Sequence, residues 1–215
     1  MYRAFRCDIF IVFQEIFIAN FALEEKAIMI KWIFKKIWHW WGWKVTGTDP
    51  NLTPKKIIVV IPHTSNWDFP VGYLMKVWYP LDVRWIAKSQ MFRWPFGGIF
   101  KAMGGIPVNR KLAKDFVGTM IGLYNEHDVF STAIAPEGTR RKVDKLKSGY
   151  YRIAVGANIP IIYTKFDWKN MEVDYGPPKM PADTWEEERT YATEYFKDTV
   201  GRVPENSFGY PFDKK

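Results

Sequence analysis

A histidine and an aspartate five positions apart are the clearest candidates for chemistry in this chain. His63 and Asp68 belong to the segment Pro-His-Thr-Ser-Asn-Trp-Asp, which directly follows an apolar run ending at Ile61. An imidazole held at one nitrogen by a carboxylate keeps its other nitrogen free to take a proton. The pair is therefore a candidate general base with its orienting carboxylate. The same residues are also consistent with a well-capped helix that follows a loop histidine.

The local pattern predicts how the two side chains meet. The β-branched run 56–61 predicts a buried strand, and the helical spacing of apolar residues in 69–78 predicts a helix. Ser65 or Asn66 is a natural N-cap, and with Ser65 as the cap Asp68 occupies the third helical position of a capping box. A side chain at that position points back toward the preceding loop, where the histidine lies.

Two further groups of polar residues follow predicted strands. Arg110 ends one short strand, and Glu137-Gly138-Thr139-Arg140 follows another. Ligands bind at the carboxyl ends of strands in an open α/β sheet, and the planar guanidinium group suits phosphate oxygens. Gly138 allows either close approach of a ligand to the backbone or a positive φ. Taken singly, these residues are also consistent with a plain surface turn and a surface salt bridge.

The elements that must position these residues alternate along the chain. Apolar runs predict further strands at 82–87, 104–110, 129–135, 159–166 and 171–175, and helical patterns predict helices at 93–103, 114–125, 149–156 and 185–200. A chain of 215 residues is long enough for one such domain with a full core. We therefore expect a single α/β domain whose central sheet is mostly parallel or mixed and is flanked by helices.

Composition narrows the class of protein. Cys7 is the only cysteine, and His39, His63 and His127 have no metal-binding spacing, so we expect neither a disulfide framework nor a metal site. The formal net charge of +8 predicts an anionic partner, such as nucleic acid, acidic lipid or an acidic carrier protein. Aromatic residues make up 18% of the chain, which favours a membrane surface, because tryptophan and tyrosine collect at such interfaces.

The first apolar stretch, residues 9–23, is interrupted by Gln14, Glu15 and Asn20. A membrane-spanning helix needs about 20 apolar residues, so the stretch is short for one, although a spanning or re-entrant segment stays an alternative. No small-residue cleavage site follows it, which argues against a signal peptide. Met29 is an alternative start of the protein.

Residues 30–43 predict a basic amphipathic helix. Lys31, Lys35 and Lys36 follow helical spacing beside a broad apolar face. Five tryptophans fall within twelve residues: Trp32, Trp38, Trp40, Trp41 and Trp43. Such a helix is typical of a lipid headgroup layer, and a core-facing helix with solvated lysines is the alternative. We therefore expect residues 1–45 to form a membrane-associating segment and residues 46–215 to form the α/β domain.

Four blocks of the sequence together resemble a known family. The segment His63–Asp68 is similar to the H-x-x-x-x-D motif of the glycerolipid acyltransferases, which include the 1-acylglycerol-3-phosphate acyltransferases. Residues 105–110, ending in arginine, resemble the second block of that family. Pro136–Arg140 matches its E-G-T-R block, and residues 159–161 resemble its fourth. The blocks occur in order over residues 56–166, so the resemblance covers most of the predicted domain.

The resemblance implies an O-acyltransferase that acts on lipids. His63 would take the proton from a glycerol hydroxyl that attacks the thioester of acyl-CoA or acyl-carrier protein, and Asp68 would orient His63. No cofactor is expected beyond that thioester substrate. The acceptor would be a lysophospholipid, and the protein would lie at the cytoplasmic face of a membrane. The residues expected to hold the acceptor are Ser65, Arg110, Glu137, Gly138, Thr139 and Arg140.

Two other classes of function fit parts of the pattern. A catalytically silent lipid-binding or carrier-docking protein could keep the same scaffold, but pure binding would not need both His63 and Asp68. A nucleic-acid-binding domain would fit the positive charge. However, the sequence shows no recognised nucleic-acid module, and its tryptophans are not interleaved with basic strand residues, so we expect no nucleic-acid partner.

Overall fold

A seven-stranded sheet forms the centre of the described chain, which comprises residues 25–79, 81–108 and 113–211 of the computed structural model. The strand order is β1-β7-β6-β2-β5-β3-β4. Neighbouring strands are parallel except for β6 and β7, which are antiparallel. The predicted mixed sheet is thus confirmed. The strands are β1 (Lys44–Gly47), β2 (Lys55–Ile61), β3 (Arg84–Lys88), β4 (Gly105–Val108), β5 (Phe130–Ile134), β6 (Ile161–Asp167) and β7 (Glu172–Tyr175).

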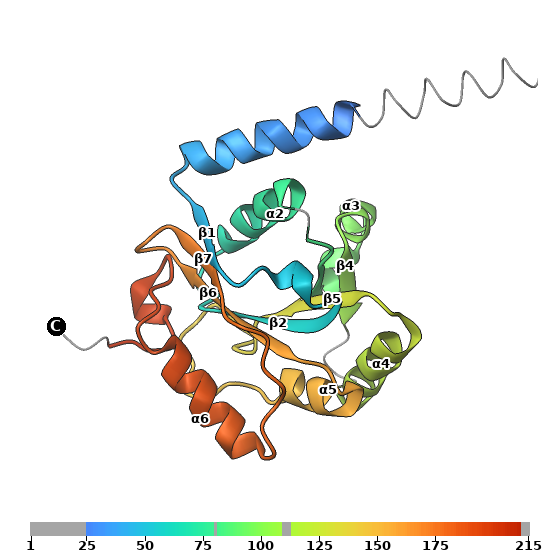
Figure 1. Ribbon diagram of the computed structural model, residues 1–215, viewed down its shortest axis with the longest axis vertical. Coiled ribbons are helices and arrows are strands. Elements are labelled where there is room, and N and C mark those ends of the chain that lie inside the picture. The colour runs from blue at the N-terminus through green and yellow to red at the C-terminus, as the bar shows by residue number, and fades with distance from the viewer. Residues whose placement is uncertain (1–24, 80, 109–112, 212–215) are drawn as a thin grey trace, which may run out of the picture.

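Helices cover both faces of the sheet, as the sequence predicts. Figure 1 shows α2 and α3 on one face and α4, α5 and α6 on the other. Their bounds are α2 (Asp68–Trp78), α3 (Gly97–Ala102), α4 (Ala113–Glu126), α5 (Gly149–Ala157) and α6 (Trp185–Phe196). The structure also contains the short 3-10 turns η1 (Pro50–Leu52), η2 (Ser89–Phe92) and η4 (Pro204–Asn206). The sequence analysis does not predict β1, which directly follows the residues assigned to the amphipathic helix.

The central strand β2 is apolar from Ile57 to Ile61 because both of its faces are buried there. Ile57, Val59 and Ile61 pack into one core with residues of α4, α5 and α6. Ile58 points the other way, into a second core with Val71 of α2. Successive side chains of a strand point to opposite faces of its sheet, so a strand between two helical layers has no polar alternation.

A helix over residues 25–40 lies outside α2 and packs on the domain through its C-terminal end. Trp38 and Trp43 are fully buried in the second core, so the interpretation of the whole tryptophan group as interfacial is wrong for these two. Trp32 and Trp40 are exposed, and Trp40 keeps 89% of its surface accessible. Residues 9–23 lie outside the described residues. In the described part of the chain, no helix combines the length and the hydropathy that a membrane span requires.

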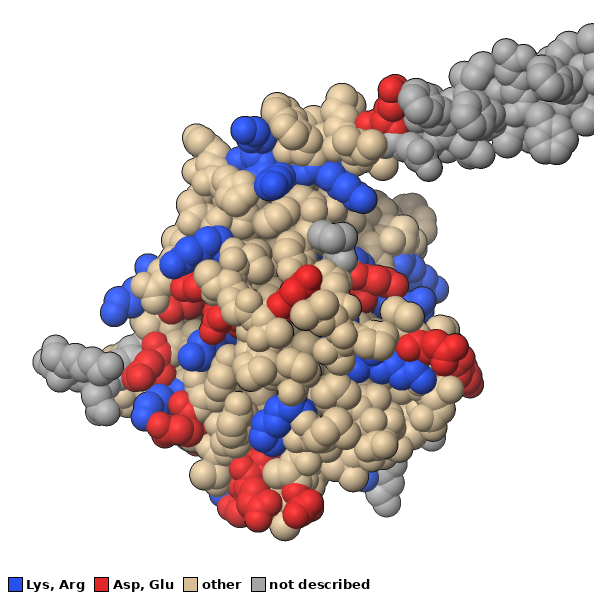
Figure 2. Space-filling model, viewed as in Figure 1, with Lys and Arg blue, Asp and Glu red and all other residues tan. Residues whose placement is uncertain are grey.

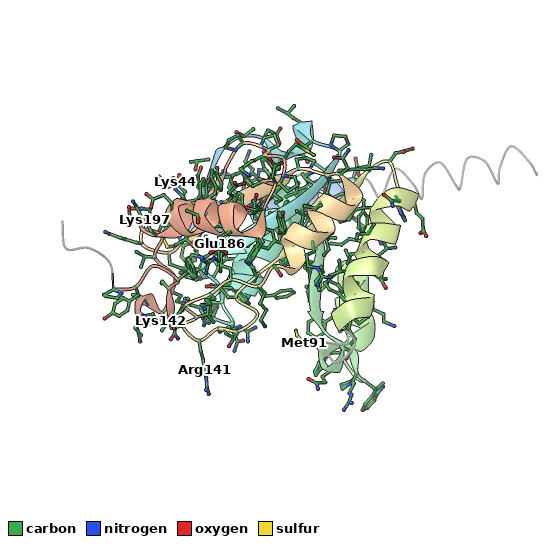
Figure 3. All side chains as sticks on the ribbon, turned by 90° about the horizontal axis from the view of Figure 1, so that it is seen from below. Lys44, Met91, Arg141, Lys142, Glu186 and Lys197 are labelled. Carbon is green, nitrogen blue, oxygen red and sulfur yellow. The ribbon has the colours of Figure 1, made fainter. Side chains whose placement is uncertain are left out.

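The register of the sheet brings several loops to one edge. In the parallel pairs of β2, Val59 lies opposite Ile134 of β5, and Ile61 lies opposite Lys165 of β6. The chain therefore leaves β2, β5 and β6 at the same carboxyl edge, where ligands bind in open α/β sheets. Figure 3 shows Met91, which follows β3, and Arg141, which follows β5, at a common edge of the molecule.

Candidate active site

The turn after β2 places His63 against Asp68. The Nδ1 atom of His63 lies 3.0 Å from Oδ2 of Asp68. The aspartate side chain is buried, whereas the histidine side chain keeps 28% of its surface accessible. Because the carboxylate occupies Nδ1, Nε2 is the nitrogen able to exchange a proton with a substrate. The close approach of His63 and Asp68 that the sequence predicts is therefore present.

The helix start that holds Asp68 differs from the predicted one. The helix α2 begins at Asp68, and its N-cap is Trp67 rather than Ser65 or Asn66. The Ser65 hydroxyl instead accepts the backbone N–H of Trp67 at 3.2 Å. Half of the capping box is nevertheless formed, because Asp68 Oδ2 accepts the backbone N–H of Ser65 at 2.9 Å. This bond turns the carboxylate back over the loop, as a capping box does.

A third donor reaches Asp68 from a distant part of the chain. The indole N–H of Trp168, in the turn between β6 and β7, donates to Asp68 Oδ1 at 2.8 Å. Both carboxylate oxygens are therefore hydrogen-bonded, Oδ1 to Trp168 and Oδ2 to Ser65 and His63. These hydrogen bonds fix the orientation of the carboxylate.

Glu137, in the loop after β5, holds the same turn through a hydrogen bond to its backbone. Its side chain is 3% exposed, and its Oε2 accepts the backbone N–H of His63 at 2.7 Å. Burial raises the pKa of Glu137 to about 8, and the hydrogen bond from His63 only partly opposes this effect. At neutral pH the Glu137 carboxyl is therefore mostly protonated, and Asp68 is the carboxylate that faces the imidazole.

The residues after Glu137 form a tight turn and then an exposed loop. Gly138 has a φ of +65°, and a Cβ atom there would lie 2.4 Å from Nζ of Lys147, so glycine leaves room for this lysine. The Thr139 hydroxyl accepts the backbone N–H of Arg141 at 3.3 Å. Arg140 and Arg141 are exposed, and neither forms an ion pair with another described residue. Their guanidinium groups are thus available to an anionic ligand.

A segment near the C-terminus packs over the turn that holds His63. Val203 donates its backbone N–H to the Thr64 hydroxyl at 3.2 Å, and a Cβ on Gly201 would collide with the same threonine. The Arg202 guanidinium lies between two indoles, 5.0 Å from the Trp67 ring and 4.8 Å from the Trp168 ring. Sequence reasoning missed these contacts. The available signal was the place of Trp168 after β6, a strand parallel to β2 and beside it.

Two further predictions concern Arg110 and a metal site. Arg110 lies outside the described residues, so its place at the edge stays a prediction. The described residues hold no group of three or more histidine, cysteine, aspartate and glutamate side chains that could bind a metal ion. The chemistry that the geometry offers is proton transfer by His63 at a rim with accessible arginines.

Comparison with known proteins identifies the family of this chain. A family model described as Acyltransferase matches residues 43–163, more than half of the chain. The fold is similar to that of the 1-acyl-sn-glycerophosphate (LPA) acyltransferase PlsC from Thermotoga maritima, with a TM-score of 0.51 and 19% sequence identity. The similarity covers 79% of this chain and 76% of that one. Comparison with curated proteins finds no match. The resemblance seen in the motifs is confirmed by the family match: this chain belongs to the acyltransferase family.

Proposed function

We propose that this enzyme transfers a fatty acyl group from an acyl thioester to the hydroxyl of a lysophospholipid-type acceptor at a membrane surface. The contact between His63 Nδ1 and Asp68 Oδ2 is the observation that carries the proposal. It prepares a general base at the edge of the sheet where the loop with Arg140 begins. The matched family and the lysophosphatidic acid acceptor named for PlsC support this choice of substrate.

In the proposed reaction, Nε2 of His63 takes the proton of the acceptor hydroxyl. The hydroxyl oxygen forms a bond to the thioester carbonyl carbon, and the resulting tetrahedral intermediate breaks its carbon–sulfur bond. The proton then passes from His63 to the leaving thiolate of CoA or of the carrier's pantetheine group. Asp68 keeps the imidazole in the tautomer that accepts at Nε2 and stabilises the imidazolium ion.

The loop after β5 is proposed to hold the polar head of the acceptor. Arg140 and Arg141 are exposed at the rim, and a guanidinium group binds phosphate oxygens with two parallel hydrogen bonds. Glu137 and Gly138 shape this loop, the first through the His63 backbone and the second through its positive φ. Ser65, Thr139 and Arg110 complete the set of residues that we assign to acceptor binding.

The helix over residues 25–40 is proposed to attach the enzyme to the lipid surface. Ile30, Ile33, Ile37 and Trp40 are exposed on it, although such side chains are usually buried in a core helix. Figure 2 shows lysines on this helix close to α2. Basic side chains beside the exposed apolar ones suit an anionic membrane surface, which we place on the cytoplasmic side.

A second apolar surface lies on the same side of the sheet. Trp94, Phe96 and Ile99, in and just before α3, are all exposed, and Trp94 keeps 93% of its surface accessible. Arg93 and Lys101 are exposed beside them. We include this surface in the membrane contact, because an exposed apolar group flanked by basic side chains fits the boundary between headgroups and acyl chains.

The test of the proposed activity is a panel of lysophospholipid acceptors offered to the full chain with labelled acyl-CoA or acyl-carrier protein. We expect at least one acceptor to receive the label, and we expect His63→Ala to lower the rate of transfer by about 10²–10⁴-fold. The matched control is His127→Ala, on the turn between α4 and β5. Lipid binding without acyl transfer for every acceptor would indicate a silent binding protein and contradict the proposal.

The membrane contact is tested by flotation with vesicles that contain anionic phospholipid. Replacing Ile37 and Trp40 together with serine should reduce the bound fraction, because both side chains are exposed on the helix. The control is Val129→Ser, which changes an exposed apolar residue before β5. Equal flotation of both variants and the wild type would show that this helix is not the attachment.

A further inference from the structure

We propose that Trp168 is a positioning residue of the acyl-transfer reaction, because its indole N–H fixes the Asp68 carboxylate that orients His63. This inference rests on the proposed function. Asp68 Oδ2 is already held by Ser65 and faces His63, so Oδ1 is the atom that sets the rotation of the carboxylate plane. The 2.8 Å bond from Trp168 Nε1 to Oδ1 fixes that rotation.

Three contacts hold Trp168 in place. The backbone N–H of Trp168 donates to the carbonyl oxygen of Val200 at 2.8 Å. Its ring meets the buried Trp43 edge to face, with 4.9 Å between the ring centroids. On another side the Arg202 guanidinium lies 4.8 Å from the ring centre. A donor held in this way loses little entropy when it binds the carboxylate, which is the condition for positioning a reacting group.

Other tryptophans of the same core make the role of Trp168 specific. The indole nitrogens of Trp38, Trp43 and Trp78 are buried and form no hydrogen bond within the described structure. These rings therefore contribute packing alone, whereas Trp168 also donates a hydrogen bond to the Asp68 carboxylate. Trp168 also lies beyond residues 43–163, the part of the chain that the family model matches. The catalytic unit therefore extends past the family motifs into the turn after β6.

The test compares Trp168→Phe with Trp78→Phe in the full chain. Both changes remove one indole nitrogen, but only the first removes a donor from Asp68. For Trp168→Phe we expect kcat to fall about tenfold, the typical effect of losing a hydrogen bond to a charged group. The KM values of the acyl thioester and of the acceptor lipid should change little, because Trp168 acts through Asp68.

A variant of the same shape excludes a loss of packing as the cause. Incorporating benzothienylalanine at position 168 replaces the indole N–H with sulfur and preserves the size of the ring. We expect this protein to reproduce the fall in kcat with the stability of the wild type. Unchanged kcat in both the benzothienyl protein and Trp168→Phe would overturn the proposal.

A measurement without turnover separates this inference from the proposed function. The proton on His63 Nδ1 exchanges with water at a rate that nuclear magnetic resonance can measure. We expect faster exchange in Trp168→Phe and in the benzothienyl protein, and the wild-type rate in Trp78→Phe. Equal rates in all of these proteins would contradict a positioning role. If no acceptor is acylated by the wild type, the proposed function fails, and the exchange rate still decides the role of Trp168.

Discussion

The turn after β2 and the loop after β5 lie side by side at one edge of the sheet, yet the structure holds them very differently. In the first, the Asp68 carboxylate receives hydrogen bonds from Ser65, His63 and Trp168. In the second, Arg140 and Arg141 are exposed and form no ion pair with a described residue. One region is fixed from several elements, and the other presents its charges to solvent.

This difference corresponds to two tasks in the proposed reaction. Proton transfer depends on the imidazole being held within a fraction of an ångström of its productive position, so the first region is rigid. Binding a phosphate-bearing head requires only accessible charge, and long arginine side chains can adapt to it. Changes in the turn after β2 should therefore lower kcat, whereas changes in the exposed loop should raise KM.

The largest expected effect comes from removing the base itself. His63→Ala should lower the rate of acyl transfer by about 10²–10⁴-fold, the usual contribution of a general base. The measurement is the initial rate with labelled acyl-CoA, beside His127→Ala as the control. A His63→Ala enzyme as active as the wild type would show that the turn after β2 does not carry the catalytic base.

Glu137 links the two regions, and its protonation should make the free energy of unfolding depend on pH. Its carboxyl keeps a proton up to a pKa of about 8, whereas the unfolded chain releases it near 4.5. The folded state thus binds more protons in that interval, and rising pH favours unfolding. This group should lower the free energy of unfolding by up to about 1.4 kcal/mol for each pH unit between those values.

Glu137→Gln provides the matched variant, because its amide oxygen can still accept the His63 backbone N–H but does not titrate. We expect the stability of this variant, relative to the wild type, to increase steadily from pH 5 to pH 8. Chemical denaturation at a series of pH values measures this difference. Parallel stability curves for the two proteins would show that Glu137 has an ordinary pKa.

Arg140→Ala tests the exposed loop. Loss of one charged contact to phosphate should raise the acceptor KM about tenfold and leave kcat nearly unchanged. Steady-state kinetics with varied acceptor measures both constants, and Arg152→Ala, an exposed arginine of α5, is the control. A fall in kcat with an unchanged KM would show that Arg140 acts in the chemical step, as the turn after β2 does, and not in acceptor binding.

The smallest expected effect concerns the backbone of the loop. Gly138→Ala should reduce the free energy of unfolding by about 1–2 kcal/mol, because an L-residue is strained at a φ of +65°. The control is Gly118→Ala on α4, where an added Cβ has open space. That change should raise stability by about 0.5–1 kcal/mol. If Gly138→Ala were as stable as the wild type, the loop would be free to change its backbone.

The parts of the site that are local in sequence could be predicted. The spacing of Ser65 and Asp68 indicates half of a capping box, and the structure forms that half. The β-branched run before Pro62 indicates a buried strand, which is β2. Such short-range patterns are read directly from side-chain periodicity and hydrogen-bonding capacity.

The remaining contacts could not be predicted, because they depend on how the elements pack. Trp168 is 100 residues from Asp68 in the chain, and no local pattern links the two side chains. The burial of Trp38 and Trp43 follows from the docking of the helix over residues 25–40 on α2 and the sheet. Sequence periodicity shows that the helix has an apolar face but cannot divide that face between core and surface.

The most direct test of this division of tasks is the single-turnover rate of acyl transfer at a saturating concentration of acceptor. Saturation removes differences in binding, so the rate reports the chemical step alone. We predict that Arg140→Ala reacts at the wild-type rate and that Asp68→Asn is slower by about 10²-fold or more. Asp68→Asn reacting at the wild-type rate would contradict the assignment of His63 and Asp68 as the catalytic pair.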